Sequence, residues 1–210
     1  MDYATLVAGP DVKGSIQYAI NYARIDSEGI LEEAQAWIYS KIRTRDMIAT
    51  ADVPIAEGLA TAEFPPGYLD AIHFGVPGYI NRLRLKDVEW FRTHLGWDEN
   101  AALPDGLPTY WCDTGSAINL NTKADQDYTA KMVFYRRPTA LSSSNTTNFL
   151  TTRYPTLLRR ACLMFAAEAR KEYDTLDREE VRALQAVKDI MVEDDVAKRG
   201  MELDFNWDAN

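Results

Sequence analysis

The distribution of proline constrains this chain more than any other feature of its sequence. Seven of the nine prolines lie between residues 52 and 147, whereas the residues on either side carry long helical patterns. Proline lacks a backbone donor and breaks or kinks a helix, so the middle of the chain is predicted to form short strands and turns. We therefore expect an α+β fold that is mainly α: helices at about 13–47 and 155–200, with a β-rich insertion at about 52–147.

Two helices are predicted near the N-terminus, at 13–23 and at 28–45. The second carries apolar residues three and four positions apart, on one stripe: Leu31, Ala34, Ile38 and Ile42. Asp26 or Ser27 is the expected N-cap, because a short side-chain oxygen at this position accepts a hydrogen bond from the first turn.

Two further helices are predicted near the C-terminus, antiparallel and joined by a short turn. The first begins at Pro155, since proline fits the first turn of a helix. Asp177 and Glu180 have capping-box spacing and predict the start of the second. Its expected apolar stripe is Leu184, Val187 and Met191.

The middle of the chain has recognisable strand and turn patterns. The strongest strand is predicted at 128–136, where aromatic and β-branched residues alternate with polar ones. A hairpin is expected around Thr114-Gly115, and the remaining elements are weaker: strands at 60–64 and 80–85 and a short helix at 87–95, capped by Asp87.

The last ten residues, 201–210, form a candidate extended tail. Leu203, Phe205 and Trp207 alternate there with acidic and amide residues. This pattern suits an edge strand packed on the chain's own bundle, and it equally suits insertion into a groove on another protein.

Composition and charge exclude several classes of protein. The chain has 210 residues without a long Gly/Ser linker, so a single domain over 1–210 is expected. A net charge of −9, with 32 acidic and 23 basic residues, argues against a tight DNA-binding protein. No membrane-spanning run or secretory leader is evident, and the two cysteines, Cys112 and Cys162, are expected to be buried thiols of a cytoplasmically made protein.

The sequence contains no recognisable catalytic or cofactor motif. His73 and His94 lack the neighbours of a metal site or a catalytic triad, and neither common phosphate-binding loop occurs. We therefore expect a protein that is not an enzyme and binds no cofactor or metal. The alternative is a small hydrolase with a dispersed site such as Asp113, His73 and Glu89.

Two stretches of the sequence resemble the adaptor, or head-to-tail connector, proteins of tailed phages. The segment EGILEEAQAWIYSKIRTRDM (28–47) resembles the family's first long helix with its closing Arg-x-Arg-Asp/Glu-Met. The segment 128–174 resembles the family's Tyr-Thr strand, its Leu-Ser-x-x-Asn-x-Thr-Asn loop and the Tyr-Pro that opens the core helix. The chain departs from the usual family pattern at Phe149-Leu150 and Arg160-Ala161-Cys162.

The resemblance implies a structural virion protein, assembled in the host cytoplasm, that forms a ring of about twelve copies beneath the portal. Such a ring continues the DNA channel without binding DNA sequence-specifically, binds tail or stopper proteins below, and contacts no membrane. The alternative within the same connector is a tail-completion or stopper protein.

Two sets of contact residues follow from this resemblance. The tail residues Leu203, Phe205 and Trp207 are the candidate portal contacts, because buried aromatic side chains dominate such interfaces. The candidate inter-subunit contacts are charged residues of the C-terminal helices: Arg159, Arg160, Arg170, Glu179 and Glu180. For any one of these, a pair within its own chain is the competing interpretation.

Overall fold

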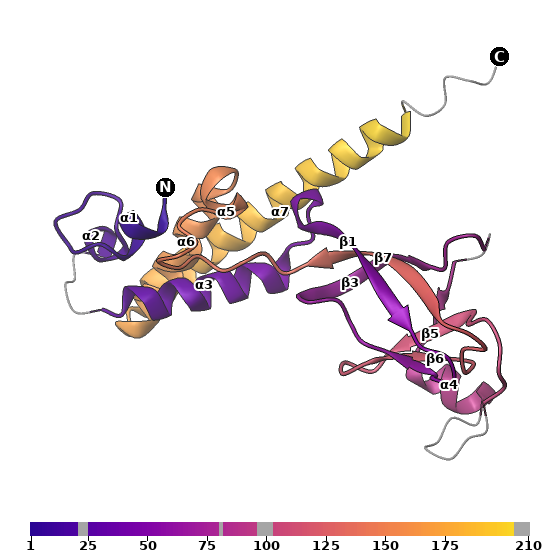
Figure 1. Cartoon of the computed structure of the whole chain (residues 1–210). Coiled ribbons are helices and arrows are strands. Elements are labelled where there is room, and N and C mark those ends of the chain that lie inside the picture. The colour runs from indigo at the N-terminus through magenta and orange to yellow at the C-terminus, as the bar shows by residue number, and fades with distance from the viewer. Residues whose placement is uncertain (21–24, 80–81, 96–102, 204–210) are drawn as a thin grey trace. The chain divides into compact units, whose positions relative to one another are not determined.

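The computed structural model describes residues 1–20, 25–79, 82–95 and 103–203, and it divides into two compact units (Figure 1). A helical unit comprises Met1–Asp46 and Pro138–Asn210, and a sheet unit comprises Met47–Arg137. The fold class is α+β, as predicted, with the strands between the two sets of helices. The sheet unit spans 47–137, whereas the sequence predicted an insertion at 52–147.

The helical unit is built on α3 (Ser27–Lys41). Asp26 is its N-cap, as predicted, and its Oδ1 accepts the Gly29 N–H at 3.0 Å. The helix ends four residues before the predicted end at 45, because Ile42 is extended and the Arg43 guanidinium donates to the Tyr39 and Ile42 carbonyls. A 3₁₀ turn, η1 (Arg45–Met47), follows.

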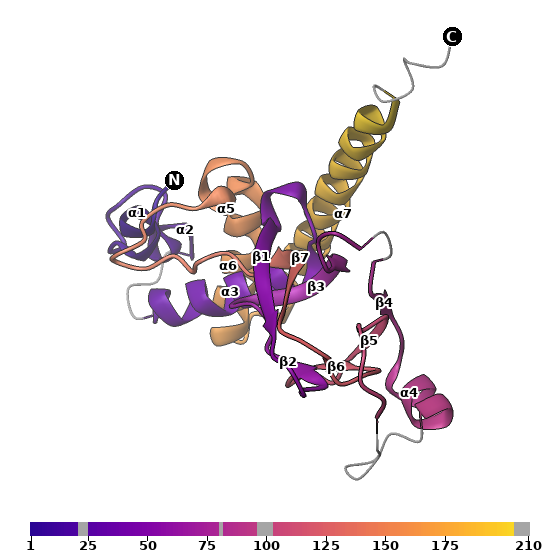
Figure 2. The same cartoon turned by 45° about the vertical axis from the view of Figure 1, so that its right-hand side comes forward.

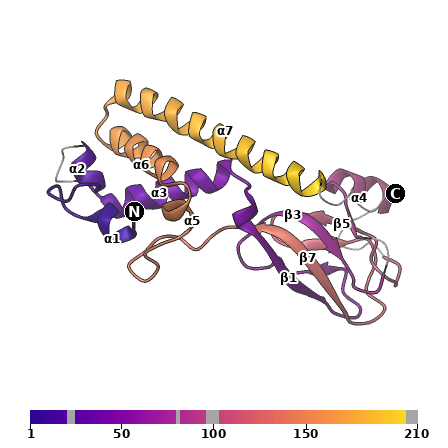
Figure 3. The ribbon, with the colours of Figure 1, turned by 90° about the horizontal axis from the view of Figure 1, so that it is seen from above.

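Helices α6 (Pro155–Ala169) and α7 (Tyr173–Leu203) pack on each other, and α3 packs on α6 (Figure 3). Pro155 opens α6, as predicted. The predicted start of α7 at Asp177 was wrong. The Lys171 backbone adopts a positive φ of 59°, and the Glu172 N–H reaches back to the Ala167 carbonyl, so that the chain reverses tightly and α7 begins at Tyr173.

Three short helices complete this unit. They are α1 (Tyr3–Val7), α2 (Ile16–Ile20) and α5 (Phe149–Thr152). The prediction of a helix at 13–23 is confirmed over α2, while residues 21–24 lie outside the described residues. The sequence analysis missed α1, whose Asp2 side chain accepts the Thr5 N–H at 2.9 Å.

The sheet unit contains two sheets (Figure 2). The first is antiparallel, with strand order β1 (Ile48–Ile55), β7 (Tyr128–Arg136) and β3 (Tyr68–Gly75). The bounds of β7 are those predicted, and its buried side chains alternate with more exposed ones along the strand. β1 and β3 were not predicted.

The second sheet has the order β2 (Thr61–Ala62), β6 (Ile118–Leu120), β5 (Tyr110–Asp113) and β4 (Arg84–Leu85). The predicted hairpin joins β5 and β6, with Gly115 at a φ of 81° in its turn. β2 and β4 are shorter than predicted, and residues 80–81 of the second prediction lie outside the described residues. α4 (Val88–Leu95) is capped by Asp87, as expected.

One apolar cluster holds the two sheets together. Phe74 of β3 and Trp111 of β5 meet edge to face, with ring centroids 5.5 Å apart. Phe91 of α4 is also fully buried.

Candidate assembly surface

The charged residues predicted as inter-subunit contacts divide into two groups in the structure. Glu179 of α7 is 4% exposed and lies among arginines of its own chain. Its carboxylate accepts hydrogen bonds from Arg160 of α6 and from Arg182, both at 2.8 Å, and Arg178 Nε lies 3.6 Å away. The pair Arg160–Glu179 therefore joins α6 to α7 within one chain.

Electrostatics favour the ionised form of Glu179. Burial by itself raises the pKa of this carboxyl, but the hydrogen bonds and charges of Arg160 and Arg182 outweigh it, so that the pKa lies below its usual value of 4.5. Arg170 is likewise tied within the chain: it donates to the Ile20 carbonyl and pairs with Glu172.

Two of the predicted contact residues remain available. Arg159 on α6 and Glu180 on α7 are exposed, and neither has an ion pair with another residue of the described ranges. Arg160, Arg170 and Glu179, by contrast, each form an ion pair within the chain.

The acidic run 193–195 is exposed at Glu193 and Asp195 but buried at Asp194. Asp194 is 3% exposed and accepts the backbone N–H and Nε of Arg45, at 3.1 and 3.2 Å. Lys198 Nζ lies 2.8 Å from its second oxygen. Burial by itself raises the pKa of Asp194, but the hydrogen bonds and charges of Lys198 and Arg45 outweigh it, so that the pKa lies below its usual value. Asp194 thus fastens α7 to the end of the first helical region.

An exposed apolar strip runs along the other face of α7. It consists of four aliphatic residues at helical spacing: Val181 (66% exposed), Leu184 (43%), Val192 (56%) and Val196 (63%). At about 100° per residue they lie on the face opposite the buried Ala183 and Ile190. Leu184 was predicted to point into the core; it does not, because the buried face of α7 is centred on Glu179, Ala183 and Ile190.

The loop that resembles the family signature, 141–148, has a structural role. The Leu141 N–H donates to Oε1 of the buried Gln35 at 2.7 Å. Asn148 forms a capping box with Thr151 at the start of α5, and its Nδ2 donates to the Tyr39 hydroxyl at 3.2 Å. The loop therefore holds α5 against α3.

The dispersed hydrolase site expected as an alternative is not assembled. His73 lies on β3, Asp113 ends β5 and Glu89 lies on α4, and no hydrogen bond or ion pair connects these three described residues. Asp113 instead accepts the Gly115 N–H at 2.6 Å. Together with burial, its charge helps raise the pKa of Tyr68 to about 12.

Both cysteines lie in the ranges that the structure describes. Cys112 and Cys162 are buried, as predicted, and burial raises their thiol pKa values to about 11 and about 12. No group of three or more potential metal ligands lies together within those ranges. None of the described helices combines the length and apolar composition needed to cross a bilayer.

The predicted tail is described only in part. Residues 201–203 belong to α7, so the helix passes Gly200, where the sequence suggested its end. Leu203 is the last residue of this helix, and Phe205 and Trp207 lie outside the described residues.

Comparison with models of protein families gives a match over residues 1–202, to the model described as SU10 adaptor protein. A comparison with curated proteins gives no match.

Proposed function

Because the chain belongs to the SU10 adaptor protein family, we propose that it is a structural subunit of a phage head-to-tail connector. In this proposal it is a virion protein, assembled in the host cytoplasm, whose copies form a ring, of about twelve, beneath the portal protein. The observation that carries the proposal is the extent of the family match, which covers the sheet unit and the helical unit up to residue 202.

The proposed contact between neighbouring subunits uses the exposed face of α7. Burying a valine or leucine side chain contributes roughly 1.5–3 kcal/mol, so the apolar strip would supply association energy. Arg159 and Glu180 are exposed and would orient neighbouring copies through opposite charges. Such a contact joins different surfaces of two copies and closes into a ring.

The proposed contact with the portal uses the end of the chain. Leu203, Phe205 and Trp207 alternate with polar residues, a pattern that suits an extended segment inserted into a groove. Because α7 extends through Leu203, the aromatic residues follow directly on a long helix.

The sheet unit is proposed to offer the attachment surface for tail or stopper proteins. The proposed channel would pass DNA without gripping it, since a net charge of −9 disfavours tight contact with phosphates.

The portal contact is tested with purified portal protein and sedimentation analysis. We expect the unmodified chain to bind portal, and Phe205→Ala/Trp207→Ala to weaken binding by at least about 30-fold, as loss of interface anchors worth 2 kcal/mol or more does. Phe149→Leu, a change inside the helical unit, is the control. Undiminished portal binding by the double variant would remove the tail from the interface.

A stopper is distinguished by its partners. An adaptor binds portal alone, whereas a stopper binds an adaptor-bearing connector or a tail assembly and leaves portal alone unbound.

A further inference from the structure

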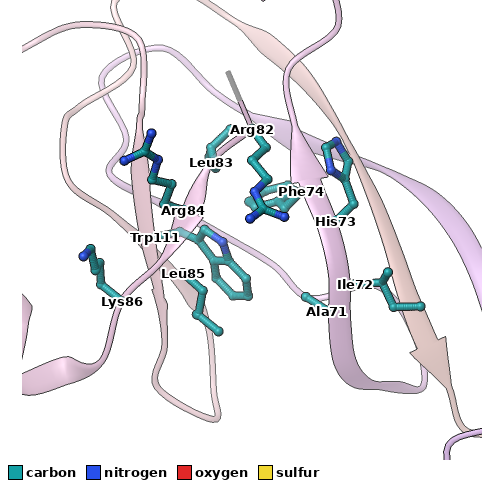
Figure 4. A pocket seen from close by; sticks show the side chains of 10 residues that line it. All are labelled: Ala71, Ile72, His73, Phe74, Arg82, Leu83, Arg84, Leu85, Lys86 and Trp111. Atoms are coloured by element: carbon teal, nitrogen blue, oxygen red, sulfur yellow. The ribbon is translucent and has the colours of Figure 1, made fainter. Parts of the chain in front are cut away.

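The sheet unit has a cavity of about 320 Å³ between β3 and β4 (Figure 4). Each of these strands is the last in its sheet, so each has one edge without a strand partner. The cavity therefore lies between two open strand edges. Its volume is near the lower end of the range for ligand pockets, which suits a short stretch of chain.

Backbone hydrogen bonds show how the two edges diverge. The Leu83 N–H donates to the Phe74 carbonyl at 2.8 Å, which joins the edges at one point. The Arg84 N–H points the other way, to the carbonyl of Thr109 just before β5, at 2.9 Å, and the Lys86 N–H donates to the Trp111 carbonyl of β5 at 2.8 Å. Backbone hydrogen-bonding groups of successive residues in an extended chain point in opposite directions. Because those of Arg84 and Lys86 point to β5, the backbone groups of Leu85 point toward the cavity.

The opposite wall of the cavity is formed by an irregular part of β3. The pairing of β3 with β7 shifts register between Ala71 and His73, which leaves Ile72 as the extra residue of a bulge. Ala71, Ile72 and His73 all line the cavity. Bulges commonly lie at sheet edges and next to binding sites.

The cavity is lined by three basic residues although the whole chain is acidic. Arg82, Arg84 and Lys86 alternate along this segment, and in Figure 4 the side chains of Arg84 and Lys86 point away from β3. In Figure 4 the Arg82 guanidinium lies between the two strands, beside Phe74. Arg82 and Arg84 are exposed and have no carboxylate partner among the described residues. Lys86 is held in place over the Trp90 ring, 5.1 Å from its centroid.

We infer that this cavity, the β3–β4 slot, receives an extended acidic segment of a tail-side protein as an added strand. Two open edges offer backbone donors and acceptors to a peptide, and the Arg82 guanidinium between them offers a cation to an acidic side chain. A phosphate or a nucleic acid strand would use the charge and leave the strand edges unpaired. The inference deepens the proposed role of the sheet unit and rests on it for the source of the segment.

The test uses the full chain, labelled with ¹⁵N, and a capped hexapeptide of alternating Asp and Val. We expect saturable amide shifts centred on Ile72 and Leu85. Arg82→Glu/Arg84→Glu should weaken binding by at least about tenfold and create binding of the matched Lys-Val peptide. Arg92→Glu, which makes half of that charge change on exposed α4, should stay within about twofold of the unmodified chain.

Two further arms separate a strand-binding slot from a simple anion site. An Asp-Val peptide with alternate backbone nitrogens methylated should lose binding. Equal binding of the methylated peptide, full competition by inorganic phosphate or a single-stranded oligonucleotide, or no binding of any peptide would each overturn the inference.

Different results would contradict the β3–β4 slot and the proposed function. The Arg82→Glu/Arg84→Glu variant should still bind portal protein. Peptide binding at the slot by a chain that does not bind portal would contradict the connector role and leave the peptide site in place.

Discussion

Glu179 is the charged side chain that joins α6 to α7 most directly. Burying a carboxylate is costly, and partners recover that cost only when they satisfy both oxygens. Arg160 reaches one oxygen from α6, and Arg182 reaches the other from α7. Loss of the carboxylate charge would leave both arginines without their counterion.

We expect Glu179→Gln to lower the free energy of unfolding at pH 7 by about 1.5–3 kcal/mol, the range for hydrogen bonds to charged groups. Because the folded-state pKa lies below 4.5, the ion pair stabilises the fold fully above that pH and stops doing so as pH falls through the folded-state pKa. The difference between the two proteins should therefore shrink below about pH 4.5. Urea denaturation at a series of pH values measures it.

Glu180→Gln is the matched control, because the neighbouring carboxylate is exposed and unpaired in the described ranges. It should change stability by less than about 0.5 kcal/mol at every pH. A difference for Glu179→Gln that stays constant down to pH 3 would contradict the electrostatic role.

At the scale of elements, the sequence predicted the helices and strands whose apolar residues recur at a regular spacing. It missed the elements whose spacing is irregular. The bounds of β7 followed from its alternation, and the starts of α3 and α6 followed from the Asp26 cap and from Pro155. β1 contains Pro54 and two alanines, which an edge strand tolerates but a strand pattern does not reveal. The bulge of β3 breaks the two-residue period at Ile72.

The candidate surface was predictable in part for a related reason. The sequence located charged residues on α6 and α7, but their partners depend on how the two helices pack, so it did not separate Glu179 from Glu180. The start of α7 depends on the left-handed backbone conformation of Lys171, and a lysine in the sequence does not predict this conformation. The strip could have been found from the second apolar set on α7, at Val181, Val192 and Val196.

We expect Val181→Asp/Val196→Asp on α7 to leave the monomer folded and to weaken ring assembly on portal by at least about tenfold. Both side chains are more than half exposed, so monomer stability should change by less than about 0.5 kcal/mol. In a subunit contact, however, the new carboxylates would be buried without partners. Thermal unfolding and sedimentation with portal measure the two effects.

Ala36→Asp places one such carboxylate on an exposed position of α3 and should assemble normally. Normal assembly of the α7 variant would place the subunit contact elsewhere.

At the scale of the whole molecule, the sheet unit is connected through two paired strands. Chain enters it at β1 and leaves it at β7, where Ile48 pairs with Tyr135. Opposite residues of an antiparallel pair have Cα atoms about 4.5–5.5 Å apart. A short linker can therefore join the two chain ends that remain when the sheet unit is removed.

Replacing residues 48–135 by a short Gly-Ser linker should therefore leave a helical protein. We expect it to retain portal binding, because the proposed portal contacts lie at 203–207, and to lose binding of tail-side proteins. Circular dichroism and sedimentation with each partner measure this. A helical variant that no longer binds portal would contradict the proposed division of roles.

The adaptor role itself is tested most directly by electron microscopy of the purified chain mixed with its cognate portal, with symmetry analysis. We predict a closed ring added at the narrow end of the portal and continuing its channel. The symmetry analysis tests whether this ring is twelvefold. Portal particles without added density, from a chain that binds an adaptor-bearing connector or a tail assembly, would contradict the adaptor role and indicate a stopper.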